Sequence, residues 1–191
     1  MPSLDPPVGM HRLNIKPDAK LVKQHQRRFR VDILQMIETK VHKLIECGFI
    51  LEEQHPDWVA NIILKLKKNG KIGVCIDFRD LNTACLKDEF LLHITVIMID
   101  NTCNFERISF MDNFSEYNQI KIYPDDEKYT SLRTPLWVYC YTVMPLGLKN
   151  AGATYQHAMS MIFIIIDERR WNAMLTILLS KVKTKTTTFT S

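Results

Sequence analysis

The chain has 191 residues, of which 46% are hydrophobic and 24% are charged, and its formal net charge is +4. This composition excludes an intrinsically disordered protein, and the length suits one compact domain or two small lobes. No stretch reaches the ~18 uncharged apolar residues of a membrane span, because the charged residues 167–170 interrupt the apolar run at residues 159–179, so we expect no membrane partner.

The five cysteines are scattered, with no Cys-x-x-Cys pair and no histidine pair nearby. We therefore expect reduced thiols, no disulfides and no zinc site, which suits the cytoplasm or the nucleus. Prolines and an aspartate in the first seven residues also argue against a secretory signal peptide.

Residues 1–26 lack periodicity and predict an extended basic arm, with order beginning after it. Across residues 26–47 the apolar positions recur every three or four residues, which predicts a helix with one buried face. Gly48 is the expected C-terminal stop of this helix. The arm and residues 65–71 concentrate Lys and Arg, a pattern that suits a polyanionic partner or simply the solvated faces of ordinary elements.

Strands are predicted at residues 49–52, 58–66 and 72–76. Between the last two, Asn69-Gly70 predicts a tight hairpin turn, because this pair accepts positive φ angles. Lys67, Lys68 and Lys71 would make its tip cationic. Further along, a helix is predicted at residues 94–100, strands at 107–111, 118–122 and 138–143, and a second long helix at 150–163.

Asp112 follows the apolar strand predicted at residues 107–111. A carboxylate at the end of a strand can hold a divalent cation at a rigid edge, as two-metal phosphoryl transfer requires. A single aspartate in this place more often ends a turn or caps a helix.

Three longer segments, one of which contains Asp112, bear on the role of this residue. They read WVANIILKLKKNGKIGVCIDFRDLN at residues 58–82, SFMDNFSEYNQI at 109–120 and YCYTVMPLGLKNAGATYQHAM at 139–159. In this order they resemble the fingers motif and the first two palm motifs of reverse transcriptases, of the gypsy class of long-terminal-repeat retrotransposons. The resemblance covers residues 11–163.

The resemblance implies an α+β fold, a right-hand polymerase fingers subdomain with an incomplete palm. It divides the chain into an extended arm (1–26), fingers (27–86), a first part of the palm (87–117), hairpins of fingers and palm (118–145), a palm helix (146–163) and a divergent tail (164–191). The implied activity is RNA-directed DNA polymerisation, a nucleotidyl transfer within a Pol polyprotein. The implied partners are an RNA or DNA template-primer and deoxynucleotide triphosphates.

The resemblance also assigns roles to individual residues. Asp112 corresponds to the catalytic, metal-binding aspartate, with Mg²⁺ as the implied cofactor. The nucleotide-binding positions are Lys67, Lys68, Asn113, Tyr117 and Gly147. The template-primer contacts are Lys71, Arg79, Asn150 and Gln156. Alternatives remain open: Tyr117 as a core residue, Arg79 in an ion pair with Asp77 or Asp80, and Asn150 as a helix cap.

The chain departs from the family pattern in several places. Gly73 stands where an arginine is usual, Glu116 where a small residue is usual, and Trp137 where a turn glycine is usual. No adjacent aspartates follow Asp126, and Met-Leu-Thr-Ile at residues 174–177 occupies the place of the Tyr-x-Asp-Asp hairpin.

A one-base frameshift near codons 164–177 would explain this divergent tail. We therefore expect a truncated, inactive reverse transcriptase fragment. The alternatives are a non-catalytic nucleic-acid-binding remnant and an unstable product without a role.

Overall fold

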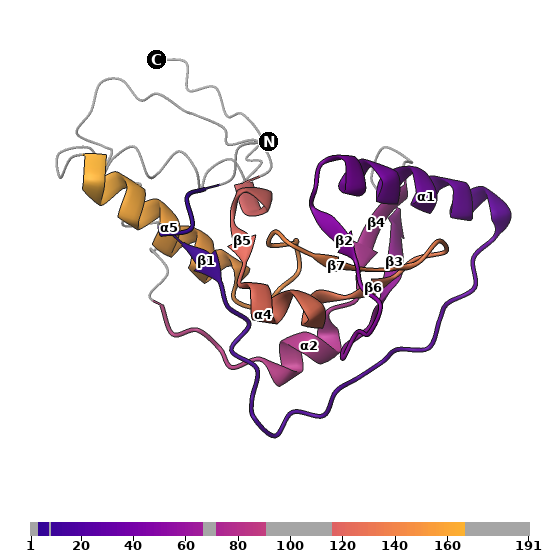
Figure 1. Cartoon of the computed structure of the whole chain (residues 1–191), viewed down its shortest axis with the longest axis horizontal. Helices are drawn as coiled ribbons and strands as arrows, with labels where there is room; N and C mark the ends of the chain where they lie inside the picture. The colour runs from indigo at the N-terminus through magenta and orange to yellow at the C-terminus, as the bar shows by residue number, and fades with distance from the viewer. Residues whose placement is uncertain (1–3, 8, 67–71, 91–115, 167–191) are drawn as a thin grey trace, which may run out of the picture.

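The computed structural model describes residues 4–7, 9–66, 72–90 and 116–166 and shows a mixed α/β fold (Figure 1). Its longer elements are the helices α1 (Val31–Glu46) and α5 (Ala151–Ile166) and the strands β2 (Ile50–Glu52), β3 (Ala60–Leu66), β4 (Ile72–Ile76) and β7 (Val138–Tyr141). The shorter ones are β1 (Met10–His11), α2 (Arg79–Ala84), β5 (Lys121–Ile122), α4 (Pro124–Glu127), β6 (Leu132–Arg133) and the 3-10 helices η1 (Glu116–Gln119) and η2 (Lys128–Thr130). The helix predicted at 94–100 and the strand predicted at 107–111 lie outside the described residues.

Two sheets organise these elements. The larger has five strands in the order β2-β7-β6-β3-β4, and the smaller pairs β1 with β5 in parallel. In Figure 1, α1 and the larger sheet form one side of the molecule, and α5, β1 and β5 form the other, with α2 and α4 between them. The mixture of helices and sheets is compatible with the predicted fold class.

The predicted hairpin is present as the antiparallel pair β3–β4. Its register runs from Ile62 opposite Ile76 to Leu66 opposite Ile72. Residues 67–71, which connect the two strands, lie outside the described residues. Apolar and branched residues dominate both strands, as is typical of β-strands.

Helix α1 confirms the predicted helix but begins at Val31, since Arg30 is still extended with φ −69° and ψ 157°. Its end is as predicted. Gly48 has a φ of +69°, its N–H donates to the Ile45 carbonyl at 2.8 Å, and the Phe49 N–H donates to the Leu44 carbonyl at 2.9 Å. These two bonds are the Schellman arrangement, for which glycine pays no steric penalty.

The expectation that order begins only after residue 26 is wrong. The segment is extended, but His11 and Leu13 are buried. β1 pairs with β5, Ile15 bridges Cys85 and Lys23 bridges Val59. Figure 1 shows the segment running along the edge of the molecule from β1 to α1. The residues that pair with this segment are distant in the sequence, so local periodicity could not predict the pairing.

The strand predicted at 118–122 is also largely wrong. Residues 116–119 form η1, and only Lys121–Ile122 pairs as a strand. The strand predicted at 138–143 is confirmed as β7 followed by a bridge at Val143, and the helix predicted at 150–163 is confirmed as α5.

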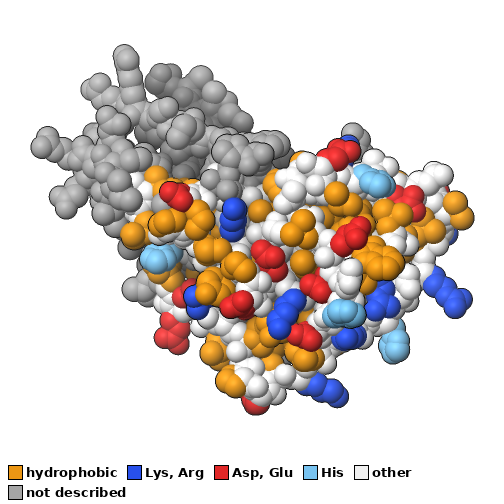
Figure 2. All heavy atoms as spheres, viewed as in Figure 1, with side chains coloured by type: hydrophobic (Ala, Val, Ile, Leu, Met, Phe, Trp, Pro, Cys, Tyr) orange, Lys and Arg blue, Asp and Glu red, His pale blue; other side chains and the backbone are white. Residues whose placement is uncertain are grey.

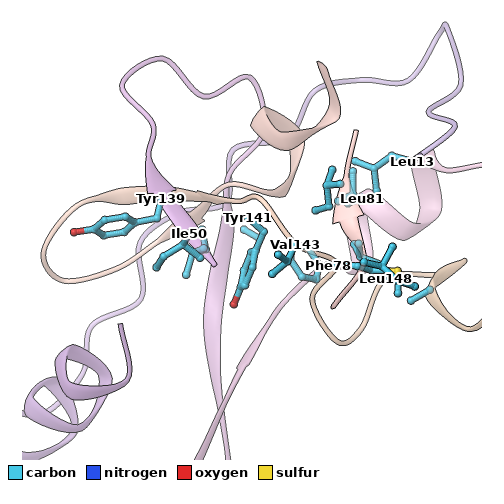
Figure 3. Packing of buried hydrophobic residues seen from close by; sticks show 14 of the residues in the cluster. Leu13, Ile50, Phe78, Leu81, Tyr139, Tyr141, Val143 and Leu148 are labelled. Atoms are coloured by element: carbon cyan, nitrogen blue, oxygen red, sulfur yellow. The ribbon is translucent and has the colours of Figure 1, made fainter. Parts of the chain in front are cut away.

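A single cluster of buried side chains joins both halves of the described chain. Figure 3 shows part of it, with side chains from the arm, β2, α2, β7 and the segment before α5: Leu13, Ile50, Phe78, Leu81, Tyr139, Tyr141, Val143 and Leu148. Because the arm and the C-terminal elements share this core, removing either would expose apolar surface.

The surface carries both charges. On the face in Figure 2, acidic and basic side chains lie interspersed among apolar ones, without a continuous basic area. None of the described helices combines the length and the hydrophobicity needed to cross a bilayer. The described cysteines, Cys47, Cys75, Cys85 and Cys140, are free thiols.

Candidate nucleic-acid interface

The loop before α5 is fastened to α2 through Asn82. The Asn82 Nδ2 donates to the Gly147 carbonyl at 2.8 Å, and its Oδ1 accepts from the Lys149 N–H at 2.8 Å. Gly147 has a φ of +106°, a left-handed conformation that glycine adopts without strain. One amide side chain therefore holds the backbone of the predicted nucleotide-binding glycine against the segment at residues 77–82.

Asn150 makes a second link to the same region. It is 6% exposed, its Nδ2 donates to the Leu86 carbonyl at 2.8 Å, and its Oδ1 accepts from the Asp88 N–H at 3.0 Å. The Thr154 N–H bonds to the Asn150 carbonyl at 3.0 Å, so Asn150 starts α5 through its backbone. Its side chain is used across the fold and does not cap the helix.

Two further predicted site residues lie at or beside α5. Tyr117 is half-buried and packs its ring against Tyr155, with 5.6 Å between ring centroids and an interplanar angle of 48°. Gln156 is buried, and its Oε1 has no hydrogen-bond partner among the described residues. Tyr117 thus packs against the core, which was the alternative role open for it.

Arg79 forms the ion pair that the sequence left open between two aspartates, and its partner is Asp77. Its Nε and Nη2 donate to the two Asp77 carboxylate oxygens at 2.7 Å each, and Arg27 approaches the same carboxylate at 3.4 Å. Hydrogen bonding from Arg79 lowers the pKa of Asp77 and raises the pKa of Arg79 itself. The Asp77 side chain is buried whereas that of Arg79 is 79% exposed, so the guanidinium is both fixed and accessible.

Around this ion pair, Gln24 ties the arm to α2 and β3. Its Nε2 donates to Asp80 Oδ2 at 2.8 Å, and its Oε1 accepts from the Asn61 N–H at 2.9 Å. Sequence reasoning missed Gln24, Arg27 and Asn82. Asn82 lies inside the quoted fingers segment, which was the available signal, but its partner 65 residues away could not be read from the sequence.

The remaining predicted site residues lie outside the described residues: Lys67, Lys68, Lys71, Asp112 and Asn113. Gly73, where the family pattern has an arginine, pairs with Lys65 inside the β3–β4 hairpin and brings no cationic side chain there. Within the described ranges, no group of three His, Cys, Asp or Glu side chains could hold a metal ion. Binding of Mg²⁺ by Asp112 therefore stays a prediction.

The chain is similar in sequence to known proteins over a region that includes parts of the three motif segments. The sequence model of the family described as reverse transcriptase (RNA-dependent DNA polymerase) matches residues 65–183. This match continues past Phe163, where we expected the resemblance to end, and the frameshift stays a prediction.

Several proteins similar in sequence agree with the family match. Protein K02A2.6 of Caenorhabditis elegans is 34% identical over 129 residues, which cover 66% of this chain and 10% of that protein. The retrovirus-related Pol polyprotein from transposon 412 of Drosophila melanogaster is 27% identical over 162 residues, covering 82% of this chain and 13% of the polyprotein. That from transposon gypsy is 24% identical over 132 residues, covering 66% and 13%.

The chain thus spans only 10% to 13% of the length of these relatives. The residues that match the family model include the end of β3, the strand β4, α2 with Asn82, and the whole of α5. The chain therefore belongs to the reverse transcriptase (RNA-dependent DNA polymerase) family, as a domain of the kind found in retrotransposon Pol polyproteins.

Proposed function

We propose that this chain is the template-gripping part of a retrotransposon reverse transcriptase, comprising fingers and the beginning of a palm. The observation that carries the proposal is the clamp made by Asn82 and Asn150. It joins the end of the fingers motif and the residues that follow it, 77–88, to the loop and helix at residues 147–156 in the second palm motif. A nucleic acid contacted by either motif would therefore meet one fixed surface.

Arg79 is the described residue best suited to a backbone phosphate. A guanidinium that is already ordered by two hydrogen bonds to Asp77 loses little side-chain freedom when it binds. Arg27 shares the same carboxylate, so two guanidinium groups meet at one buried aspartate. Lys67, Lys68 and Lys71 are proposed to act with it, on triphosphate and template phosphates, from the connection between β3 and β4.

Asp112 is proposed as a ligand of Mg²⁺, with Asn113, Tyr117 and Gly147 on the nucleotide and Asn150 and Gln156 towards the template-primer. A bound Mg²⁺ supplies the charge that activates and stabilises the reacting oxygens in nucleotidyl transfer. Within these 191 residues no adjacent aspartates follow Asp126. We therefore propose that this chain alone lacks polymerase activity.

Primer extension on the purified chain tests this proposal. The assay uses a labelled deoxynucleotide and a template-primer with Mg²⁺ or Mn²⁺, beside a copy whose reading frame is restored by one base near codon 164. We expect incorporation only in the restored copy. Incorporation by the unmodified chain would overturn the proposed inactivity, and codons at 164–177 that cannot encode Tyr-x-Asp-Asp in another frame would reject the frameshift.

A second function is favoured by the position of Arg79 and Arg27, which need no metal to attract phosphate. The chain would then act as a non-catalytic nucleic-acid-binding module. Its affinity should fall steeply with salt, and each lost phosphate contact should reduce the slope of log K against log salt by about 0.7 to 0.9. Binding that persists unchanged in Asp112→Ala, with no incorporation by either copy, would favour this module over the polymerase.

A further inference from the structure

The turn between β6 and β7 displays a tryptophan on a rigid support. Thr134 is buried, and its Oγ1 accepts from the Leu136 N–H at 3.1 Å and the Trp137 N–H at 3.0 Å while donating to the Trp137 carbonyl at 2.7 Å. The Thr134 N–H donates to the same carbonyl at 3.0 Å. These bonds close the turn and fix the backbone of Trp137, yet the residue stays 54% exposed.

The exposed indole is available to a partner that covers it. Large aromatic side chains gain most from burial, and they have few rotamers to lose when a partner covers them. The hydrogen bonds of Thr134 have already ordered the backbone, so a partner would find the ring partly preorganised. The turn therefore favours a planar ligand that can stack.

Beside this turn lies a cationic cavity. Thr134 and the following Pro135 line it together with Arg27, Arg133 and Asn61, and its volume is about 30 Å³. The Arg133 Nε is buried, and the part of the chain that is described offers it neither a hydrogen bond nor a carboxylate. The space suits a water molecule, so an anion would lie at the opening and contact the arginines from outside.

The surrounding charges indicate the side from which a ligand comes. Arg133 pairs with Val138 on the β6 side of β7, whereas the Glu53 N–H bonds to the Val138 carbonyl from the β2 side at 3.0 Å. Among the described residues Arg133 forms no ion pair, so its positive charge is in excess beside the cavity. A polyanion would approach over β6 and avoid Glu53.

We propose that Trp137, with Arg133 and Arg27, binds unpaired nucleotides of a single nucleic-acid strand. The indole stacks on a base and the guanidinium groups contact the adjoining phosphates, a combination that bases within a duplex cannot use because their faces are already stacked. The inference rests on the proposed function and adds to it a site for the single-stranded part of the template. A second copy of this chain would instead prefer an apolar surface without excess charge.

The test measures binding of the full chain by fluorescence anisotropy. One labelled duplex carries an overhang of about eight unpaired nucleotides, and a control duplex of equal paired length is blunt; the overhang length follows the site sizes of single-strand-binding folds. The variants are Trp137→Ala, Trp137→Phe and Arg133→Gln. Leu136→Ala is the matched control, since Leu136 is an exposed apolar residue on the same turn, at 41%.

We expect Trp137→Ala to weaken binding of the overhang duplex by about 5-fold to 100-fold and to leave the blunt duplex within 2-fold. Trp137→Phe should retain most of the affinity and Leu136→Ala all of it. Arg133→Gln should lower the salt dependence of overhang binding by about 0.7 in the logarithmic slope.

Equal effects of Trp137→Ala on both duplexes, or no effect on either, would overturn the inference while leaving the proposed function intact. Absence of binding to both duplexes by the unmodified chain would instead remove the proposed function itself. A dimer in sedimentation that Trp137→Ala dissociates would reassign the turn to contact between two copies and reject the site for single strands.

Discussion

Replacing Asn150 by aspartate tests the clamp between the two motif segments. The substitution keeps the shape of the side chain and the bond from the Asp88 N–H, but it removes the donor to the Leu86 carbonyl and sets a carboxylate oxygen against that carbonyl. The site is buried, so losing the hydrogen bond and burying a charge should together cost about 3 kcal/mol at pH 7. For a chain of this length that lowers Tm by about 6–12 °C.

The penalty should depend on pH in a defined direction. A free aspartate titrates near 3.9, and burial beside a carbonyl raises the pKa of the new carboxyl group in the folded state. Between these two pKa values the folded state binds more protons than the unfolded state, so the free energy of unfolding falls as pH rises. The protonated form can also donate to the Leu86 carbonyl, which restores the lost bond at low pH.

Urea unfolding, followed by circular dichroism, measures these effects. At each pH the free energy of unfolding of the variant is compared with that of the unmodified chain. Asn150→Ala removes both bonds without adding charge and should cost about 2 kcal/mol at every pH. Gln35→Glu adds a similar charge on the exposed side of α1 and should change little. The reasoning is refuted if Asn150→Asp unfolds with the unmodified chain at pH 7, or if its penalty is larger at pH 5.

Other predictions concern separate parts of the fold. Burial lowers the pKa of His11 to about 4, so stability should be lost by about 3 kcal/mol as pH falls from 6.5 to 4, and urea titrations should show a flatter profile in His11→Gln. Gly147→Ala should cost about 1–3 kcal/mol through its positive φ, and an unchanged thermal midpoint would contradict this. Burial raises the pKa of Cys85 and of Cys140 to about 11. Iodoacetamide should therefore label the exposed Cys47 and Cys75 first and reach the two buried thiols only on unfolding, as mass spectrometry of the peptides would record.

The predictable parts of the fold are those set by neighbouring residues. Gly48 ends α1 because a left-handed residue follows the last turn, and Asn69-Gly70 lies between two strands that do pair as a hairpin. The helix α5 was likewise predicted from residues that are close together in the sequence. In each case the sequence within a few residues contains the physical cause.

The parts that sequence could not predict depend on distant partners. His11 and Leu13 are buried by elements more than 100 residues away, such as Thr154 and Asp126, so their segment looked like a free arm. β6 has two residues, too few for any periodicity. An ion pair of Arg79 was anticipated as an alternative, but its partner could have been either Asp77 or Asp80, and the structure shows Asp77. For Asn150 the alternative was a helix cap, whereas its side chain binds the Leu86 carbonyl and the Asp88 N–H.

The strand order also has a consequence for synthesis of the protein. β3 lies between β4 and β6, so during translation its second edge stays unpaired until residues 132–133 have left the ribosome. Other tertiary contacts join residues even farther apart, such as Thr142 with Gly48, 94 positions away, and Thr154 with His11, 143 positions away. Such high contact order slows folding, and an open strand edge on a nascent chain can pair with another chain. Expression should therefore yield more native protein when translation is slowed or a chaperone shields β3 until the later strands arrive.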